Sequence, residues 1–168
     1  MGSRIGDVEE GRYRMTVGSA RGLDLPESFR QVTAGALDGA HLYNISLEAR
    51  SEDCHVLCLS LYREPSVTVG FDYDCALEVT NLKALSCVLA LLLKERYGQD
   101  CRVKAGLCQY RTRETDVHEY EELDPAFVKP LEYEGQREFR VALCLHKPVP
   151  LEPQMFADMR IASCFRAR

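Results

Sequence analysis

The sequence predicts an α+β domain, a mainly antiparallel, split sheet with one long helix packed on it. Segments with strand-like apolar alternation recur through most of the chain, and one long helical pattern lies among them. The 168 residues contain no internal repeat and no Gly/Ser-rich linker, so we expect a single domain over residues 4–168. Residues 1–3, Met-Gly-Ser, match an expression scar and are left out of the predicted fold.

The predicted strands are residues 12–17, 41–48, 54–62, 67–71, 76–79, 101–110, 138–145 and 159–165. Alternation is clean in two of them. In one, Tyr43, Ile45 and Leu47 oppose Leu42, Asn44 and Ser46. In the other, Phe139, Val141 and Leu143 oppose Glu138, Arg140 and Ala142. We expect each of these strands to bury one face.

The long helix is predicted over residues 82–97. Thr80-Asn81 supplies a capping pair before it, and Gly98 supplies the C-terminal stop. Its apolar stripe consists of Leu85, Val88, Leu89, Leu92 and Tyr97. A shorter helix is predicted over residues 26–36, because Pro26 suits a first turn and apolar residues follow at helical spacing. Residues 111–131 are rich in acidic side chains and predict a surface loop, with at most one helical turn.

Composition narrows the functional class. Hydrophobic residues make up 46% and charged residues 28% of the chain, as in a globular protein. The longest apolar run, residues 87–93, is far below the roughly 18–20 residues that span a bilayer, so we expect no membrane association. The net charge of -5 disfavours binding of nucleic acid by bulk electrostatics. We expect a cytoplasmic protein.

Eight cysteines are present, yet no Cys-x-x-Cys pair occurs. Cys54 and Cys58 lie in a predicted strand, where residues four apart are about 13 Å from one another, so they predict no zinc knuckle. Cys87, Cys144 and Cys164 fall in apolar segments and are expected to be small buried hydrophobes. We therefore interpret the cysteines as reduced structural thiols, with disulfides or metal ligation as the alternative.

Candidate chemistry centres on the start of the strand at residues 138–145. By the period-two rule, Gln136, Glu138 and Arg140 share one face. A carboxylate there suits chemistry at a sugar C1′, because it can bind the ribose 2′-hydroxyl and stabilise an oxocarbenium-like transition state, while the amide orients an acceptor. An ordinary solvated strand face is the alternative interpretation of the same spacing.

Three separated elements together resemble a known pattern. They are Gly-Asp-Val-Glu-Glu-Gly at residues 6–11, a strand ending in Cys-Leu-Ser at residues 58–60, and a Phe-x-Lys-Pro-x-x-Tyr-x-x-Gln-x-Glu-Phe-Arg signature at residues 127–140. In this order they are similar to a broad set of bacterial and phage proteins whose fold is related to mono-ADP-ribosyltransferases. The similarity covers residues 5–145 loosely, and its last element is the specific one.

The resemblance implies an ADP-ribosyltransferase-like fold and an NAD-dependent activity. On this basis Glu138 corresponds to the catalytic glutamate, Gln136 to the residue two positions before it, and Ser60 to the serine that supports the nicotinamide ribose. The resemblance also implies an early arginine that holds the dinucleotide phosphates, for which Arg12 and Arg14 are the candidates, and places Tyr133 among the NAD-binding residues. It implies transfer of ADP-ribose to a macromolecular target, protein or nucleic acid, in bacterial or phage conflict.

Other interpretations stay open. The competing class is a non-enzymatic binding module, such as an immunity, anti-defence or regulatory protein, that holds a partner with its sheet and acidic loop. Asp72, Asp74 and Glu78 are a weak candidate for a cation site, and we expect no bound metal. Another alternative is a nucleophilic Cys58 or Cys108 served by one of the four histidines, His41, His55, His118 and His146.

Overall fold

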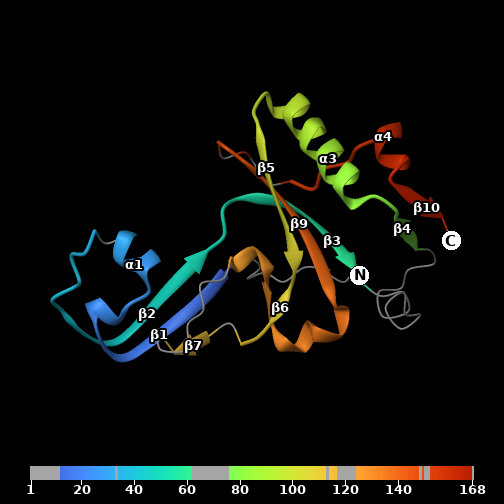
Figure 1. Ribbon diagram of the computed structural model, residues 1–168. Coiled ribbons are helices and arrows are strands. Elements are labelled where there is room, and N and C mark those ends of the chain that lie inside the picture. Colours follow the sequence, from blue (N-terminus) through green and yellow to red (C-terminus); the bar gives the residue numbers. More distant parts are fainter. Residues whose placement is uncertain are drawn as a thin grey trace. The chain divides into compact units, whose positions relative to one another are not determined.

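The protein was analysed as a computed structural model, which describes residues 12–32, 34–61, 76–112, 114–116, 124–147, 149 and 152–167. It is a mixed α+β structure with mainly antiparallel sheets, as the sequence predicts (Figure 1). The chain forms two compact units. Unit 1 comprises Met1–Ser51 and Gln109–Glu134, and unit 2 comprises Glu52–Cys108 and Gly135–Arg168. The single domain over residues 4–168 stays a prediction, and the predicted scar at residues 1–3 lies outside the described residues.

Unit 1 is built on a long antiparallel pair, β1 (Arg12–Arg21) and β2 (His41–Arg50). The short strand β7 (Glu114–Asp116) runs parallel to β1 on its other side, which gives the order β2-β1-β7. A second, two-stranded parallel sheet joins β6 (Gln109–Tyr110) to β8 (Val128–Lys129). The 3-10 helix η3 (Pro125–Phe127) precedes β8. Residues 111–131 were expected to be a surface loop with at most one helical turn, but they also contain the strands β7 and β8, so that expectation was incomplete.

The β1–β2 pair changes its buried face part-way along. Val17 and its partner Ile45 face the core, and so do Ala20 and its partner Leu42, although the two pairs are three positions apart on each strand and strict alternation would place them on opposite faces. Asn44, with a φ of 51°, lies in this interval. The predicted strict alternation was therefore wrong, since Tyr43 is 63% exposed while Leu42 is buried. The left-handed backbone at Asn44 shifts the alternation by one residue, so that side chains on its two sides follow different inward-facing patterns.

The connection between β1 and β2 folds back tightly onto the strand ends. It contains η1 (Gly22–Asp24) and α1 (Glu27–Val32), which replaces the predicted helix at 26–36 with a shorter one. The Arg30 guanidinium donates two hydrogen bonds of 3.1 Å to the Asp38 carboxylate and so ties α1 to the returning chain. A Cβ at Gly22 would overlap the backbone carbonyl of Leu37. Gly22 is thus required by close backbone approach.

Unit 2 contains an antiparallel sheet of order β3-β9-β5. The central strand β9 (Glu138–Leu145) pairs with β3 (Cys54–Ser60) on one side and β5 (Cys101–Leu107) on the other. The predicted strand at 101–110 is interrupted by Cys108, whose N–H donates to the Glu138 carbonyl. A separate pair joins β4 (Leu77–Val79) to β10 (Phe165–Ala167).

Strand β9 is buried on both faces. One face carries Phe139, Val141 and Leu143 toward the helix core, as the alternation predicts. On the other face, however, Glu138, Arg140 and Ala142 are also buried, so the expectation of one buried face was wrong. Side chains on both faces of β9 are therefore shielded from solvent, whereas the alternation predicted a half-exposed strand.

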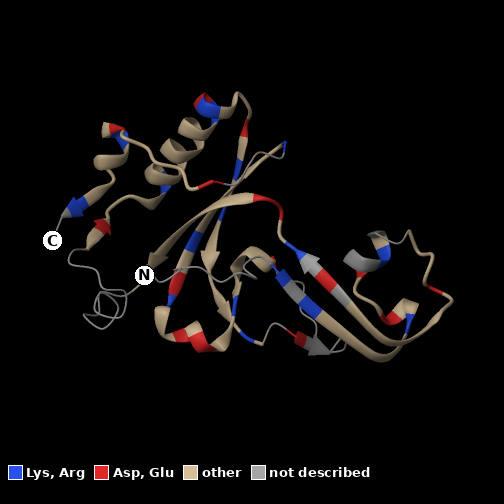
Figure 2. Cartoon of the chain, turned by 180° about the vertical axis from the view of Figure 1, so that it is seen from behind, with Lys and Arg blue, Asp and Glu red and all other residues tan. Residues whose placement is uncertain are grey.

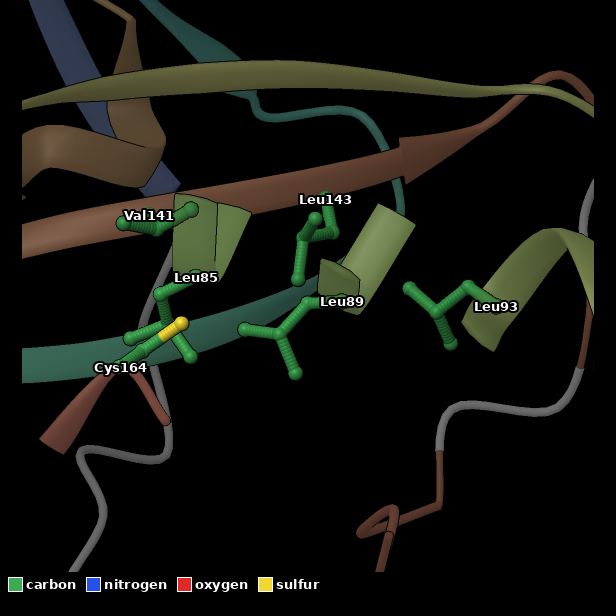
Figure 3. Close-up of a cluster of buried hydrophobic side chains, with 6 residues drawn as sticks. All are labelled: Leu85, Leu89, Leu93, Val141, Leu143 and Cys164. Carbon is green, nitrogen blue, oxygen red and sulfur yellow. The ribbon is translucent and has the colours of Figure 1, made fainter. Parts of the chain in front are cut away.

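Helix α3 (Leu82–Tyr97) has the predicted bounds. The Asn81 side chain accepts a hydrogen bond of 2.9 Å from the Ala84 N–H, and Gly98 ends the helix in the left-handed conformation. Figure 3 shows Leu85, Leu89 and Leu93 of α3 beside Val141 and Leu143 of β9, with Cys164 completing the cluster. The core of unit 2 therefore lies between α3 and the sheet.

The C-terminal segment differs from the predicted strand at 159–165. Its first residues form α4 (Met159–Ala162), and β10 begins only at Phe165. The physical reason is local: the Asp158 carboxylate accepts a hydrogen bond from the Arg160 N–H and caps a helical turn. Among the described residues, no helix combines the length and apolar character needed to cross a membrane. The predicted strand at 67–71 lies outside the described residues.

Candidate functional site

Ser60 and Glu138 face each other across neighbouring strands. They are direct partners in the antiparallel β3–β9 ladder. The next pair outward is hydrogen-bonded, since the Leu61 N–H donates to the Arg137 carbonyl over 3.1 Å. Ser60 and Glu138 therefore form a non-hydrogen-bonded pair, in which side chains approach most closely and lie on the same face of the sheet. The structure thus brings together two of the residues that the sequence singled out.

The Glu138 carboxylate is held from inside the protein. Its Oε2 accepts a hydrogen bond of 3.2 Å from Nη2 of Arg140, and it lies 3.6 Å from the Cys108 sulfur, which donates its proton. Glu138 is 7% exposed, Arg140 1% and Cys108 7%. A buried carboxylate needs such compensation, because desolvation of an unpaired charge is costly. Glu138, Arg140 and Cys108 therefore form a buried charged cluster at the start of β9.

Arg140 fits into the sheet because of its neighbours. Across the two ladders its partners are Cys58 on β3 and Gly106 on β5. Gly106 contributes no side chain on this face, and Cys58 contributes a short one, so the long guanidinium side chain has room beside Glu138. Sequence reasoning assigned no role to Arg140 or to Gly106. The available signal was a Glu-x-Arg spacing inside an otherwise apolar strand.

Gln136 departs from the predicted arrangement. It belongs to the 3-10 helix η4 (Leu131–Gln136) rather than to β9, and Arg137 between it and Glu138 has a φ of 44°. The left-handed residue breaks the period-two pattern, so the predicted shared strand face of Gln136 and Glu138 is wrong. The turn still contributes to the site, because the Ser60 hydroxyl donates to the Gln136 backbone carbonyl over 3.4 Å.

The predicted NAD-binding residues Arg12, Arg14 and Tyr133 belong to unit 1 and are described there. Arg14 forms an exposed ion pair with Glu114, with 2.9 Å between Nη1 and Oε1. Arg12 lies directly opposite Arg50 in the β1–β2 ladder, where acidic and basic positions lie close together on the strand pair (Figure 2). The Tyr133 ring, half-buried in η4, contacts the Lys129 ammonium at 5.1 Å from the ring centroid.

His55 is not placed to activate Cys58 as a nucleophile. His55 lies on β3 three residues before Cys58, so the two side chains point to opposite faces of the sheet. The His55 ring instead stacks on Tyr97 at 6.0 Å between centroids. Burial, assisted by the Arg96 charge, lowers the pKa of His55 below its ordinary value.

His41 stacks on Tyr43, and His146 is exposed. His118, Asp72 and Asp74 lie outside the described residues, and Glu78 is part of β4. Within the described ranges, no group of three or more His, Cys, Asp or Glu side chains is placed to hold a metal ion.

The cysteines of the described part form no disulfide. Cys144 and Cys164 are buried, as the apolar segments predict. Cys87 was expected to be buried and is exposed, because it lies on the face of α3 turned away from the leucine core.

The site therefore consists of an exposed serine opposite a buried, internally compensated carboxylate, with a backbone carbonyl of the adjoining turn bound to the serine. Such an arrangement provides one hydroxyl and one carboxylate on the same sheet face, and both groups can form hydrogen bonds to a polyhydroxyl ligand. No protein-family model, curated protein or solved structure matches this chain.

Proposed function

We propose that the protein transfers ADP-ribose from NAD to a macromolecular target, with Glu138 as the catalytic carboxylate. The observation that carries this proposal is the direct opposition of Ser60 and Glu138 across β3 and β9. In an ADP-ribosyl transfer, the bond between ribose C1′ and nicotinamide breaks, nicotinamide leaves, and a nucleophile of the target bonds to C1′. A carboxylate beside the ribose stabilises the positive charge that develops at C1′.

The residues of unit 2 have distinct roles in this proposal. The Glu138 carboxylate accepts a hydrogen bond from a ribose hydroxyl and lies beside the positive charge that develops at C1′. Because Ser60 is exposed, the ribose approaches from the Ser60 side of the pair. Arg140 is a positioning residue, since its 3.2 Å bond to Oε2 holds the carboxylate in place. The Gln136 carbonyl orients the Ser60 hydroxyl. This differs from the role that the sequence suggested for the Gln136 side chain.

The donor set fits a ribose better than it fits a metal. One carboxylate and one hydroxyl offer hydrogen bonds to a sugar diol, whereas a hard cation requires a set of several oxygen ligands. For Arg12, Arg14 and Tyr133, which belong to unit 1, the NAD-binding role stays what the resemblance implies. A planar guanidinium binds phosphate in bidentate fashion, which suits Arg12 and Arg14 to that task.

The test is transfer of label from NAD to a cell lysate and to purified nucleic acid. We expect transfer by the native chain and its loss in Glu138→Gln, which keeps the size of the side chain and removes the charge. Glu132→Gln is the matched control, because Glu132 is an exposed carboxylate of the adjoining η4 helix. Absence of transfer, together with no NAD-dependent rise in Tm, would overturn the proposal, because bound NAD must stabilise the folded state.

One observation favours a second candidate, the non-enzymatic binding module. The Glu138 side chain is only 8% exposed, and its carboxylate accepts hydrogen bonds from Arg140 and Cys108. A purely structural carboxylate would have the same environment. If Glu138 is only structural, Glu138→Gln lowers stability while the native chain shows neither transfer nor NAD binding. The two candidates are thus separated by the same set of variants.

A further inference from the structure

Two cysteines face each other at the other end of the sheet that carries Glu138. Cys54 and Cys144 are direct partners in the β3–β9 ladder. Cys54 and Cys144 lie six residues from Ser60 and Glu138 along their strands. Because hydrogen-bonded and non-hydrogen-bonded pairs alternate along the ladder, an even separation makes Cys54–Cys144 a non-hydrogen-bonded pair as well. In such pairs the Cα atoms are about 4.5 Å apart, which lies within the range spanned by a disulfide.

The other nearby thiols are not placed to compete for Cys144. Cys58 is the cross-strand partner of Arg140 and lies four residues from Cys54 along β3. Cys101 is the partner of Leu145 and packs with the core between the sheet and α3, on the opposite face from Cys144. The register therefore selects Cys54 as the partner of Cys144.

The two thiols differ in their access to solvent. Cys144 is 4% exposed, and burial together with the Glu52 charge raises its pKa. Lys104 and Arg102 of β5 and a hydrogen bond from Cys54 act in the opposite direction. Cys54 is half-buried at the start of an outer strand. An oxidant from solution therefore reaches Cys54 first, and Cys144 is the resolving thiol.

We propose that Cys54 and Cys144 form a redox-active dithiol that closes to a cross-strand disulfide with a small-molecule disulfide such as oxidised glutathione. The Cys54 thiolate attacks one sulfur of the oxidant, which breaks its S–S bond and releases one glutathione thiolate. The Cys144 thiolate then attacks the Cys54 sulfur, forms the intramolecular S–S bond and releases the second glutathione. Two protein thiols are oxidised, one glutathione disulfide is reduced, and the two thiol protons pass to the released glutathione.

Closure would connect β3 covalently to β9, the two strands that also carry Ser60 and Glu138. Because the bond joins residues far apart in the chain, it restricts the unfolded state and is expected to raise Tm by about 5 °C or more. The inference depends only on the register of the sheet and is independent of the proposed transferase activity.

The experiment treats the full chain with oxidised or reduced glutathione, alkylates the remaining thiols and digests the protein with trypsin. Oxidation is expected to join peptide 51–63 to peptide 141–160, since cleavage does not occur before the proline at 148. Because peptide 51–63 also contains Cys58, the decisive chain is Cys58→Ser, which leaves the proposed pair intact.

Cys87→Ser serves as the control for exposed thiols, because Cys87 lies on the solvent face of α3. We expect the linked peptides and the higher Tm in the Cys58→Ser and Cys87→Ser chains, and neither in Cys54→Ser. If the Cys58→Ser chain carries glutathione on Cys54 without the linked peptide, or if Cys54→Ser loses as many thiols on oxidation as the native chain, the proposal is overturned.

Discussion

Arg140 donates a hydrogen bond of 3.2 Å to the Glu138 carboxylate inside the unit 2 sheet, and both side chains are almost fully buried. This ion pair lies two residues apart on a strand that is otherwise apolar. The hydrogen bond fixes the orientation of the candidate catalytic carboxylate. It also makes the stability of the fold depend on both charges at the start of β9.

Removal of one charge from this pair should be far more damaging than removal of both. Arg140→Met leaves the buried Glu138 carboxylate uncompensated, so we expect the free energy of unfolding to fall by about 3–5 kcal/mol. Adding Glu138→Gln in the same chain should recover a large part of that loss, because the remaining amide carries no charge. Urea denaturation of the two single variants and the double variant measures this coupling.

The exposed pair Arg14–Glu114 is the matched control, with side chains 48% and 61% exposed. Arg14→Met should change the free energy of unfolding by at most about 1 kcal/mol. An effect of Arg140→Met as small as that of Arg14→Met would contradict a buried, compensated ion pair.

Gly22 should not tolerate any side chain. The Cβ of Gly22→Ala would meet the Leu37 carbonyl, and the Gly22 N–H donates to the Ala40 carbonyl over 3.0 Å, so the backbone has little freedom to move away. We expect the free energy of unfolding to drop by about 2 kcal/mol or more, as for overpacked sites. Gly39→Ala tests the same turn region without a clash, since nothing lies within 4 Å of the Cβ position there. Equal thermal shifts in the two variants would refute the close approach.

His55 should make the protein less stable in mild acid. Its pKa in the folded state is lowered from the ordinary 6.5 by burial and by Arg96, so the unfolded chain binds the proton more readily. The stabilising contribution is fully present above about pH 6.5 and is lost as the pH falls through the lower folded pKa. Urea midpoints measured between about pH 7.5 and 5.5 should decline, a window above the titration of most carboxylates.

His55→Phe keeps an aromatic ring to stack on Tyr97 and removes the titrating group, so part of that decline should disappear. His146→Gln, at an exposed position, is the matched control and should retain it. A decline that is the same in His55→Phe as in the native chain would show that other groups cause it.

Several elements could be predicted because their signals are local. The bounds of α3 follow from Asn81 and Gly98, a cap and a stop that act within one helical turn. The α4 turn was missed although its signal was equally local: Asp158 caps it, but the apolar spacing of Met159 and Ile161 favoured a strand. The candidate glutamate could be found from its spacing and from a resemblance. Its burial could not, because burial depends on what distant parts of the chain place over that face of the sheet.

By itself, the sequence determined the α+β character, the long helix and the strand that carries Glu138, since periodicity and capping depend on neighbours a few residues away. Only the tertiary structure decided that Ser60 stands opposite Glu138, that Arg140 is buried beside it and that Cys54 meets Cys144. The Ser60–Glu138 and Cys54–Cys144 pairs depend on the register between strands far apart in the chain, whereas the burial of Arg140 depends on what packs over its face of β9. A shift of one residue would turn every such side chain to the other face.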